Sequence, residues 1–294
     1  MGKAIGVVML NGIFARFLNS EPSGIDEHRG GQGDDRRPAG VSVEIVGLDK
    51  SFNGVPVLKN INLKIEAGET FSIIGPSGTG KSLLLKHIVK LQAPDRGQIL
   101  IDGDDINAGQ TITPKPAWRY SMVFQSSALF NSLSVGENVG LWLRENRICK
   151  ESAIRKIISE KLQMVGLQGR EQMPIAELSG GMKKRVAIAR SLAMNPDLIL
   201  YDEPTAELDP VTADDLADLI QSLKASVQLT SVIVSHDLNF ALYLSDRVAM
   251  MHDGEIVEIG TPEQIKNSTN PVVRKFIYTT TKGISKGEER DIQQ

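Results

Sequence analysis

A glycine-rich segment at residues 75–82, with the sequence GPSGTGKS, constrains the fold of this chain more than any other feature. The apolar run Phe71 to Ile74 precedes it, and Lys81 to Leu91, with apolar residues at helical spacing, follows it. In such a loop, successive backbone N–H groups point into one concavity at a helix N-terminus, where they attract phosphates. The pattern predicts a strand, a phosphate-binding loop and a helix. The predicted nucleotide ligands are Gly75, Pro76, Ser77, Gly78, Thr79, Gly80, Lys81 and Ser82.

A second apolar run, Leu198 to Tyr201, ends on two adjacent carboxylates, Asp202 and Glu203. Neighbouring side chains at a strand end point in different directions, so the two acids can do separate work. We predict that Asp202 lies near Mg²⁺ together with the Ser82 hydroxyl, while Lys81 reaches the β and γ phosphates. Glu203 is then the candidate base that orients and deprotonates an attacking water molecule.

Polar residues also follow two other apolar runs: His236 comes after residues 232–235, and Gln125 after residues 122–124. Because the carboxyl ends of parallel strands meet at one edge of a sheet, we expect the His236 imidazole to reach the same strand-tip surface, while Gln125 ends its strand at the entrance to the helical lobe. Taken alone, a histidine in this position is more often a packed or solvated residue, and the glutamine alone indicates nothing.

The alternation of apolar strands with helices predicts a mostly parallel sheet covered on both faces. Before the glycine loop, apolar residues at 43–46 and 57–63 flank the turn Phe52 to Gly54 and predict antiparallel strands. Residues from about 125 to 180 have helical periodicity instead, with an amphipathic helix ending at Gly166 as its C-cap. The predicted fold class is therefore α/β, with an antiparallel β portion and an inserted helical lobe.

Composition excludes few classes of function but sets some bounds. The 294 residues, 41% of them hydrophobic, are enough for one large α/β domain or a core domain with a smaller lobe. A net charge of -3 offers no basic field for nucleic acid, so we expect no nucleic-acid partner, and Lys183, Lys184 and Arg185 are expected on a solvated helix face. The single Cys149 excludes an internal disulfide.

No segment approaches the roughly 18 consecutive apolar residues of a membrane-spanning helix, so we expect membrane work to be done through a separate subunit. Residues 1–40 are expected to form a disordered tail and linker. An alternative stays open for part of this tail, because Leu10, Ile13, Phe14, Phe17 and Leu18 share one helical face. Such a face would suit a membrane surface or a partner.

The segment Leu178 to Met182, with the sequence LSGGM, stands between the glycine loop and the acidic strand. With the four elements above, it resembles the motif order of the ABC transporter ATPases: Walker A at 75–82, the Q-loop at Gln125, the signature at 178–182, Walker B at 198–203 and the switch histidine at His236. This resemblance covers about residues 41–260. It implies the ABC fold and ATP with Mg²⁺ as cofactors, with Gln125, Glu203 and His236 as catalytic residues and Ser82, Gln125 and Asp202 near the metal.

The same resemblance implies that two copies of the chain share each nucleotide. Phe52 would stack on adenine, and Ser179, Gly180 and Gly181 would cap the γ-phosphate held by the opposite copy. Asp209 matches the family's D-loop aspartate, but Glu207 departs from the pattern because a small residue is commoner there. The expected domains are an ABC ATPase domain over 41–265, with its helical lobe at about 125–180, and a C-terminal extension over 266–294.

Two further segments resemble the Mla and Mce lipid-transport ATPases: residues 124–145 in the lobe, and residues 270–277. That resemblance implies a permease partner, a lipid-binding Mce-domain protein and a place on the cytoplasmic face of the inner membrane, and it allows for a small regulatory subunit. The polar tail beyond Phe276 would reach the neighbouring ATPase. Ser127 and Trp142 depart from the subfamily, which has Gly and Pro at these positions, and Trp142 is either a permease contact or part of the lobe core.

Two alternatives stay open from the sequence. The ATPase of a solute importer, for amino acids or sulphonates, has the same catalytic motifs and differs only in the lobe and the tail. A non-transport ABC protein, such as a ribosome-associated factor, usually carries two cassettes in one chain, whereas this chain has one.

Overall fold

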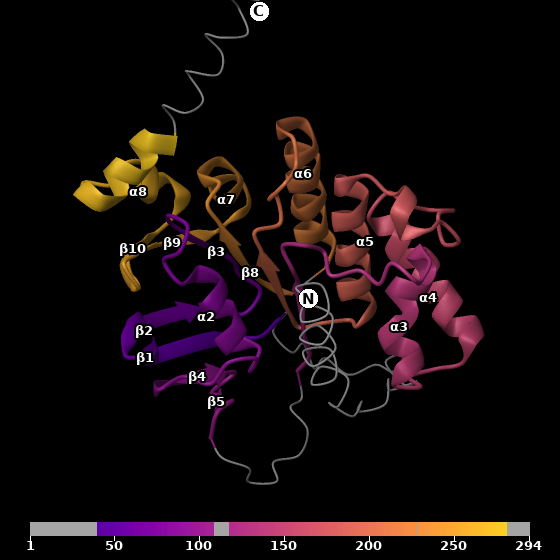
Figure 1. Cartoon of the computed structure of the whole chain (residues 1–294), viewed down its shortest axis with the longest axis horizontal. Coiled ribbons are helices and arrows are strands. Elements are labelled where there is room, and N and C mark those ends of the chain that lie inside the picture. Colours follow the sequence, from indigo (N-terminus) through magenta and orange to yellow (C-terminus); the bar gives the residue numbers. More distant parts are fainter. Residues whose placement is uncertain (1–39, 109–117, 228, 281–294) are drawn as a thin grey trace, which may run out of the picture.

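The computed structural model describes residues 40–108, 118–227 and 229–280, and the expectations for residues 1–39 and 281–294 lie outside this range. Two sheets and a group of helices form the described part (Figure 1). The predicted α/β class with an antiparallel portion and a helical lobe is confirmed. No helix in the described ranges combines the length and apolar character needed to span a bilayer.

The larger sheet has six strands in the order β10-β9-β3-β8-β7-β6. Five of them run parallel, and only β10 is antiparallel to its neighbour. Their bounds are β3 Thr70–Ile74, β6 Tyr120–Val123, β7 Leu198–Asp202, β8 Thr230–Ser235, β9 Arg247–His252 and β10 Glu255–Gly260. Every residue of β3, β7 and β8 is buried, as expected for strands covered on both faces.

The smaller sheet is antiparallel, in the order β2-β1-β4-β5. It contains β1 Val43–Phe52, β2 Val55–Ile65, β4 Arg96–Ile101 and β5 Asp104–Asp105. The turn between β1 and β2 lies at Asn53 and Gly54, both in the left-handed region, as the sequence predicts. Buried residues of this sheet and of α2 Lys81–Ile88 form one core cluster with the near side of the larger sheet.

A second core cluster belongs to the helical lobe and the helices beside it. The helices here are α3 Val135–Glu145, α4 Glu151–Met164, the 3-10 turn η1 Ile175–Glu177, α5 Gly180–Ala193 and α6 Pro210–Ser226. The sequence predicts Gly166 as the C-cap of α4, but the C-cap is Val165 and Gly166 follows it directly. Gly166 still ends the helix, because it has φ +71° and Leu167 N–H donates to Leu162 O at 2.8 Å. Trp142 is half-buried and packs against this cluster, which makes it part of the lobe core.

The helix after the glycine loop is shorter than predicted. It ends at Ile88 rather than Leu91, because Lys90 adopts φ +57° and Leu91 N–H turns back to Lys86 O. Near the C-terminus, α7 Leu238–Leu244, α8 Pro262–Lys266 and a helical run at residues 271–280 enclose a third cluster. Val273 and Phe276 are buried in it, so this part of the expected extension packs onto the domain.

Candidate active site

The glycine loop follows β3 and leads into α2, as predicted. Gly75 has φ +149°, and a Cβ there would lie 2.1 Å from the carbonyl oxygen of Met251. Gly80, the residue before α2, has φ +102°, and its Cβ would lie 2.7 Å from Leu58 Cδ2. Neither position accepts a side chain without rearrangement, so the loop needs glycine at both. Thr79 closes the loop by donating its hydroxyl to Pro76 O at 3.0 Å.

Lys81 points back into this loop and is buried. Its ammonium donates to Gly75 O at 2.8 Å and to Pro76 O at 3.0 Å, and lies 3.7 Å from Glu203 Oε1. Burial lowers the pKa of Lys81, and the nearby carboxylates of Glu203 and Asp202 oppose that shift. The loop carbonyls thus hold the ammonium at the place where the sequence predicts phosphate.

Ser82 and Asp202 meet although 120 positions separate them, with Ser82 Oγ donating to Asp202 Oδ1 at 2.6 Å. Burial raises the pKa of Asp202, whereas the hydrogen bond from Ser82 opposes the rise. Within residues 40–108, 118–227 and 229–280, no group of three His, Cys, Asp or Glu side chains could hold a metal alone. A hydroxyl and a carboxylate oxygen fit Mg²⁺, which usually binds through one or two carboxylates together with substrate phosphates.

Glu203 follows β7 in a left-handed conformation, with φ +48°. Its backbone N–H donates to Val234 O at 2.9 Å, which ties it to the end of β8. One carboxylate oxygen, Oε2, lies 2.7 Å from His236 Nδ1 and also accepts the His236 backbone N–H at 3.1 Å. The predicted meeting of Glu203 and His236 at one sheet edge is confirmed.

Gln125 lies at the same edge. Strands β6 and β7 are parallel, with Val123 opposite Tyr201. Gln125 and Glu203 each follow two residues later, so both come at the same end of the paired strands. The Gln125 side chain is exposed, but its backbone carbonyl accepts a hydrogen bond from the buried Lys184 ammonium of α5. Gln125 is therefore anchored through its backbone, with its side chain left outside the protein core.

Lys184 corrects one expectation from the sequence, which placed residues 183–185 on a solvated face. Lys184 is only 4% exposed, and Arg185 is half-buried and donates to Val165 O at 3.2 Å. The helical spacing of Gly181, Lys184 and Ile188, all buried, is the signal that could have placed Lys184 on the inner face of α5. The run of three charged residues at 183–185 outweighed that signal in the sequence prediction.

The signature segment opens α5, where Ser179 is the N-cap and accepts from Met182 N–H at 3.3 Å. A Cβ on Gly180 would lie 3.4 Å from Leu208 Cδ2, and one on Gly181 would lie 2.5 Å from Thr212 Cγ2. The signature thus lies beside the start of α6. In Figure 1, α5 belongs to the side of the molecule that carries α3 and α4, whereas α2 lies across the larger sheet. Within one chain, the glycine loop and the signature segment therefore lie apart from each other.

Asp209 is the N-cap of α6. Its carboxylate accepts from Thr212 N–H at 3.0 Å and from Thr212 Oγ1 at 2.6 Å, and these bonds hold its pKa below the ordinary value. The preceding Glu207 has φ +68°, a conformation that glycine adopts without strain. This gives a physical reason for the small residue that is common at that position.

Phe52 ends β1 and is 42% exposed, so it is not a core residue. The Lys50 ammonium lies 5.5 Å from its ring centroid, and Asp95 accepts from both Lys50 Nζ and Ser51 N–H at 2.7 Å. These contacts fix the end of the hairpin and leave the ring available for stacking. A nucleotide base is a suitable partner for such a ring.

The comparisons with known proteins agree with this geometry. The family model described as ABC transporter matches residues 58–206. The chain is 42% identical over 263 residues to the probable ribonucleotide transport ATP-binding protein mkl of Mycobacterium leprae, which covers 88% of this chain and 75% of that protein. It is 39% identical over 249 residues to the intermembrane phospholipid transport system ATP-binding protein MlaF of Haemophilus influenzae. That match covers 84% of this chain and 93% of MlaF.

Relatives named for another substrate match as well. The spermidine/putrescine import ATP-binding protein PotA of Mesoplasma florum is 39% identical over 236 residues, which cover 80% of this chain and 66% of that protein. Among solved structures, the dimeric post-hydrolysis ATP-binding cassette MJ0796 bound to ADP and Pi superposes with a TM-score of 0.67 at 34% identity. The superposition covers 75% of this chain and 98% of the MJ0796 chain. This chain therefore belongs to the ABC transporter family, as an ATP-binding subunit that hydrolyses ATP.

Proposed function

We propose that this chain powers the movement of phospholipid or a related lipid across the cell envelope, in a transporter of the Mla and Mce type. The observation that carries the proposal is the match to MlaF, because it extends over 93% of that protein. The match to PotA has the same identity but extends over 66% of PotA. A solute importer is therefore the second candidate, and a non-transport ABC protein the third.

The site geometry supports a division of labour for hydrolysis. Glu203 is the proposed general base, and His236 orients its carboxylate through the contact at Oε2. Lys81 exchanges its bonds with Gly75 O and Pro76 O for bonds to phosphate oxygens. Gln125 completes the site from the lobe side. Mg²⁺, held by Ser82 and Asp202, would neutralise charge on the phosphates.

Two copies of the chain are needed in this proposal, because the signature and the glycine loop lie on different parts of one chain (Figure 1). Ser179, Gly180 and Gly181 of one copy would face the nucleotide bound to residues 75–82 of the other, with Asp209 at the interface. The dimeric state of the MJ0796 cassette supports this arrangement. Truncation after Thr280 removes residues 281–294. If these residues reach the neighbouring copy, the truncated chain should form a weaker dimer, which a sedimentation assay would measure.

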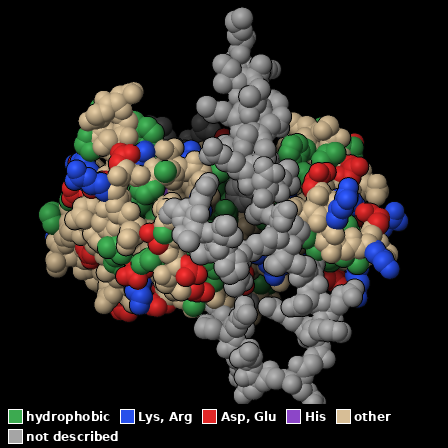
Figure 2. Space-filling view, turned by 90° about the horizontal axis from the view of Figure 1, so that it is seen from below, with side chains coloured by type: hydrophobic (Ala, Val, Ile, Leu, Met, Phe, Trp, Pro, Cys, Tyr) green, Lys and Arg blue, Asp and Glu red, His purple; other side chains and the backbone are tan. Residues whose placement is uncertain are grey.

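We further propose a peripheral position on the cytoplasmic face of the inner membrane, beneath a permease, with a lipid-binding Mce-domain protein and, as an optional partner, a small regulatory subunit. No nucleic-acid partner is proposed. The net charge of -3 offers no basic field for nucleic acid. On the part of the described surface that Figure 2 shows, basic and acidic side chains are interspersed.

Purification of the tagged chain from gently solubilised membranes tests this function. A permease together with an Mce-domain protein, and phospholipid in the extract, supports the proposal. A solute-binding protein in place of the Mce-domain protein would favour the importer, and co-sedimentation with ribosomes would favour the third candidate. The ATPase assignment does not depend on this outcome.

A further inference from the structure

The loop at residues 125–128, called here the 125–128 loop, joins β6 to the helical lobe and has an unusual backbone. Ser127 has φ +61° and Ala128 has φ +46°, so two consecutive residues with side chains adopt the left-handed conformation. Residues with a side chain seldom adopt this conformation, and Asn and Asp account for most of the exceptions. Contacts from elsewhere in the fold must therefore hold this loop in place.

Those contacts come from two buried cations of a single helix, α5. Lys184 Nζ donates to Gln125 O, and Arg190 donates to Ala128 O at 2.7 Å and to Ser127 O at 2.9 Å. Lys184 is 4% exposed and Arg190 7% exposed. Three of the four carbonyls in the loop are thus bonded to charged donors on α5, the helix that begins with the signature segment.

Lys184 also lies where three parts of the site come together. Its ammonium interacts electrostatically with the carboxylates of Glu207, Asp202 and Glu203. The ammonium is therefore within electrostatic range of the D-loop and of the acidic end of β7. A buried cation rarely adds stability by itself, and an apolar residue of similar volume is often tolerated in its place. The hydrogen bond from Lys184 to the loop is therefore better explained by a positioning role than by a gain in stability.

We infer that Lys184 is a positioning residue for ATP hydrolysis, which ties the backbone of Gln125 to α5 so that Gln125 moves as one unit with the signature helix. This inference rests on the role proposed above for Gln125. Displacement of α5 as the signature engages nucleotide would then carry Gln125 toward or away from the γ-phosphate. Arg190 supports the same loop from its far end.

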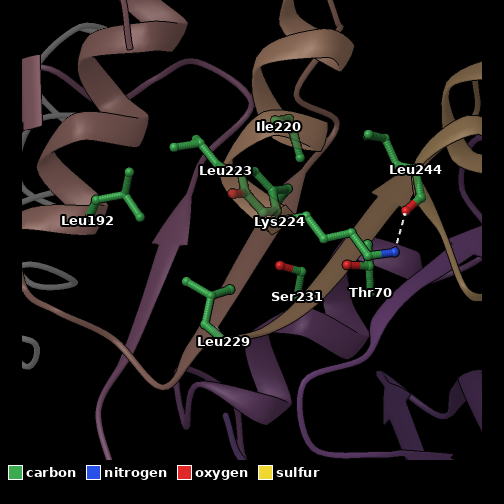
Figure 3. A pocket seen from close by; sticks show the side chains of 9 residues that line it. Thr70, Leu192, Ile220, Leu223, Lys224, Leu229, Ser231 and Leu244 are labelled. Atoms are coloured by element: carbon green, nitrogen blue, oxygen red, sulfur yellow. Dashed lines mark hydrogen bonds between the residues drawn. The ribbon is translucent and has the colours of Figure 1, made fainter. Parts of the chain in front are cut away.

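Kinetics of the full chain give the first test. Lys184→Met should lower kcat about tenfold or more with KM for ATP changed less than about twofold, because small displacements of a positioned group mainly affect the reaction step. Lys184→Arg, which keeps a charged donor, should restore most of the activity. Lys224→Met is the matched control, because Lys224 also donates from a helix to a distant carbonyl, Leu244 O at 3.3 Å (Figure 3). Lys224 also pairs with Asp246 at 2.8 Å and lines a small cavity together with Thr70 and Ser231 of the larger sheet. Since Lys224 contacts none of the site residues named above, Lys224→Met should leave kcat unchanged.

Hydrogen exchange gives a second test that needs no turnover. Ser127 N–H donates to Phe124 O at 2.8 Å, so its exchange reports on the loop. In Lys184→Met, a peptide covering residues 124–130 should exchange roughly tenfold faster, since a bond from a charged donor is lost. Lys224→Met and Lys184→Arg should exchange as the wild type does.

The two tests separate this inference from the proposed function. If the variants give the expected kcat and exchange results but the wild type drives no lipid transport, the role of Lys184 stands and the proposed transport function fails. Wild-type kcat and exchange in Lys184→Met would overturn the inference, as would an equal loss of kcat in Lys184→Met and Lys184→Arg. If Lys184→Met does not fold, Lys184→Gln replaces it, because Gln removes the charge but stays polar. Lower kcat and faster exchange in Lys184→Gln would support the inference, and wild-type values of both would overturn it.

Discussion

His236 and Glu203 are joined twice: the imidazole Nδ1 and the backbone N–H of His236 both approach the same oxygen, Oε2, of Glu203. The other oxygen, Oε1, lies 3.7 Å from Lys81 Nζ. The carboxylate is therefore fixed between a strand end and the phosphate loop, in an orientation that one residue alone could not enforce. This arrangement makes Glu203 the first target for mutagenesis.

Glu203→Gln should reduce kcat by roughly 10²- to 10⁴-fold, because the amide cannot accept the proton of the attacking water. ATP binding should remain within a fewfold of the wild type, since the phosphate loop is unchanged. Steady-state phosphate release and a fluorescent-nucleotide titration measure the two effects. The exposed Glu255 on β10 supplies the control variant Glu255→Gln. Wild-type turnover in Glu203→Gln would remove Glu203 from the mechanism.

Lys81→Ala should weaken ATP binding about 10- to 100-fold, the range expected for loss of hydrogen bonds from a charged donor. The bonds that Lys81 makes to Gly75 O and Pro76 O are also lost, so the loop itself is expected to loosen. Isothermal titration with ATP is the direct measurement, and Lys64→Ala, at an exposed position of β2, is the control. An unchanged affinity would contradict the assigned role of the glycine loop.

Asp202→Asn should stabilise the nucleotide-free protein at neutral pH while abolishing hydrolysis. The pKa of Asp202 is raised in the folded state, so its ionised form disfavours folding at pH above that pKa. The expected gain is about 0.5–2 kcal/mol, typical of a single stabilising substitution. It should shrink as the pH falls through the raised pKa, because wild-type Asp202 then becomes neutral. Urea unfolding of both proteins at several pH values checks this, and a gain that grows toward acid would contradict it.

Ser127→Val should destabilise the protein by about 1–3 kcal/mol, because a β-branched residue at φ +61° is strained. Ser127→Gly should be tolerated, since glycine adopts this conformation freely. Ser126→Val, at the exposed neighbouring position, is the matched control and should change stability by less than about 0.5 kcal/mol. Thermal unfolding compares the three variants. Equal melting temperatures for the Val variants at 126 and 127 would argue against strain at Ser127.

In the C-terminal region, the sequence did not predict which residues pack onto the domain. The sequence predicts a C-terminal extension from residue 266, with a polar tail beyond Phe276. Within that extension, Val273 and Phe276 are buried against α7 and β9. Two apolar side chains three residues apart are too short a pattern to distinguish a packed helix from a tail. The larger lobe helix α4, with apolar residues over several turns, was predictable for that reason.

The sequence by itself determined the order of local units: the strand, loop and helix around residues 75–82, the acid pair at the end of β7 and the glycine that ends α4 at residue 166. Each of these depends on neighbouring residues and on backbone preferences that a short segment already expresses. Only the tertiary structure decided that Lys184 is buried beneath Gln125 and that Ser127 and Glu207 adopt left-handed backbones. The burial of Lys184 and the conformation of Ser127 involve hydrogen bonds from α5 to residues some 60 positions earlier in the chain, and packing across such separations overrides what the local charge pattern favours.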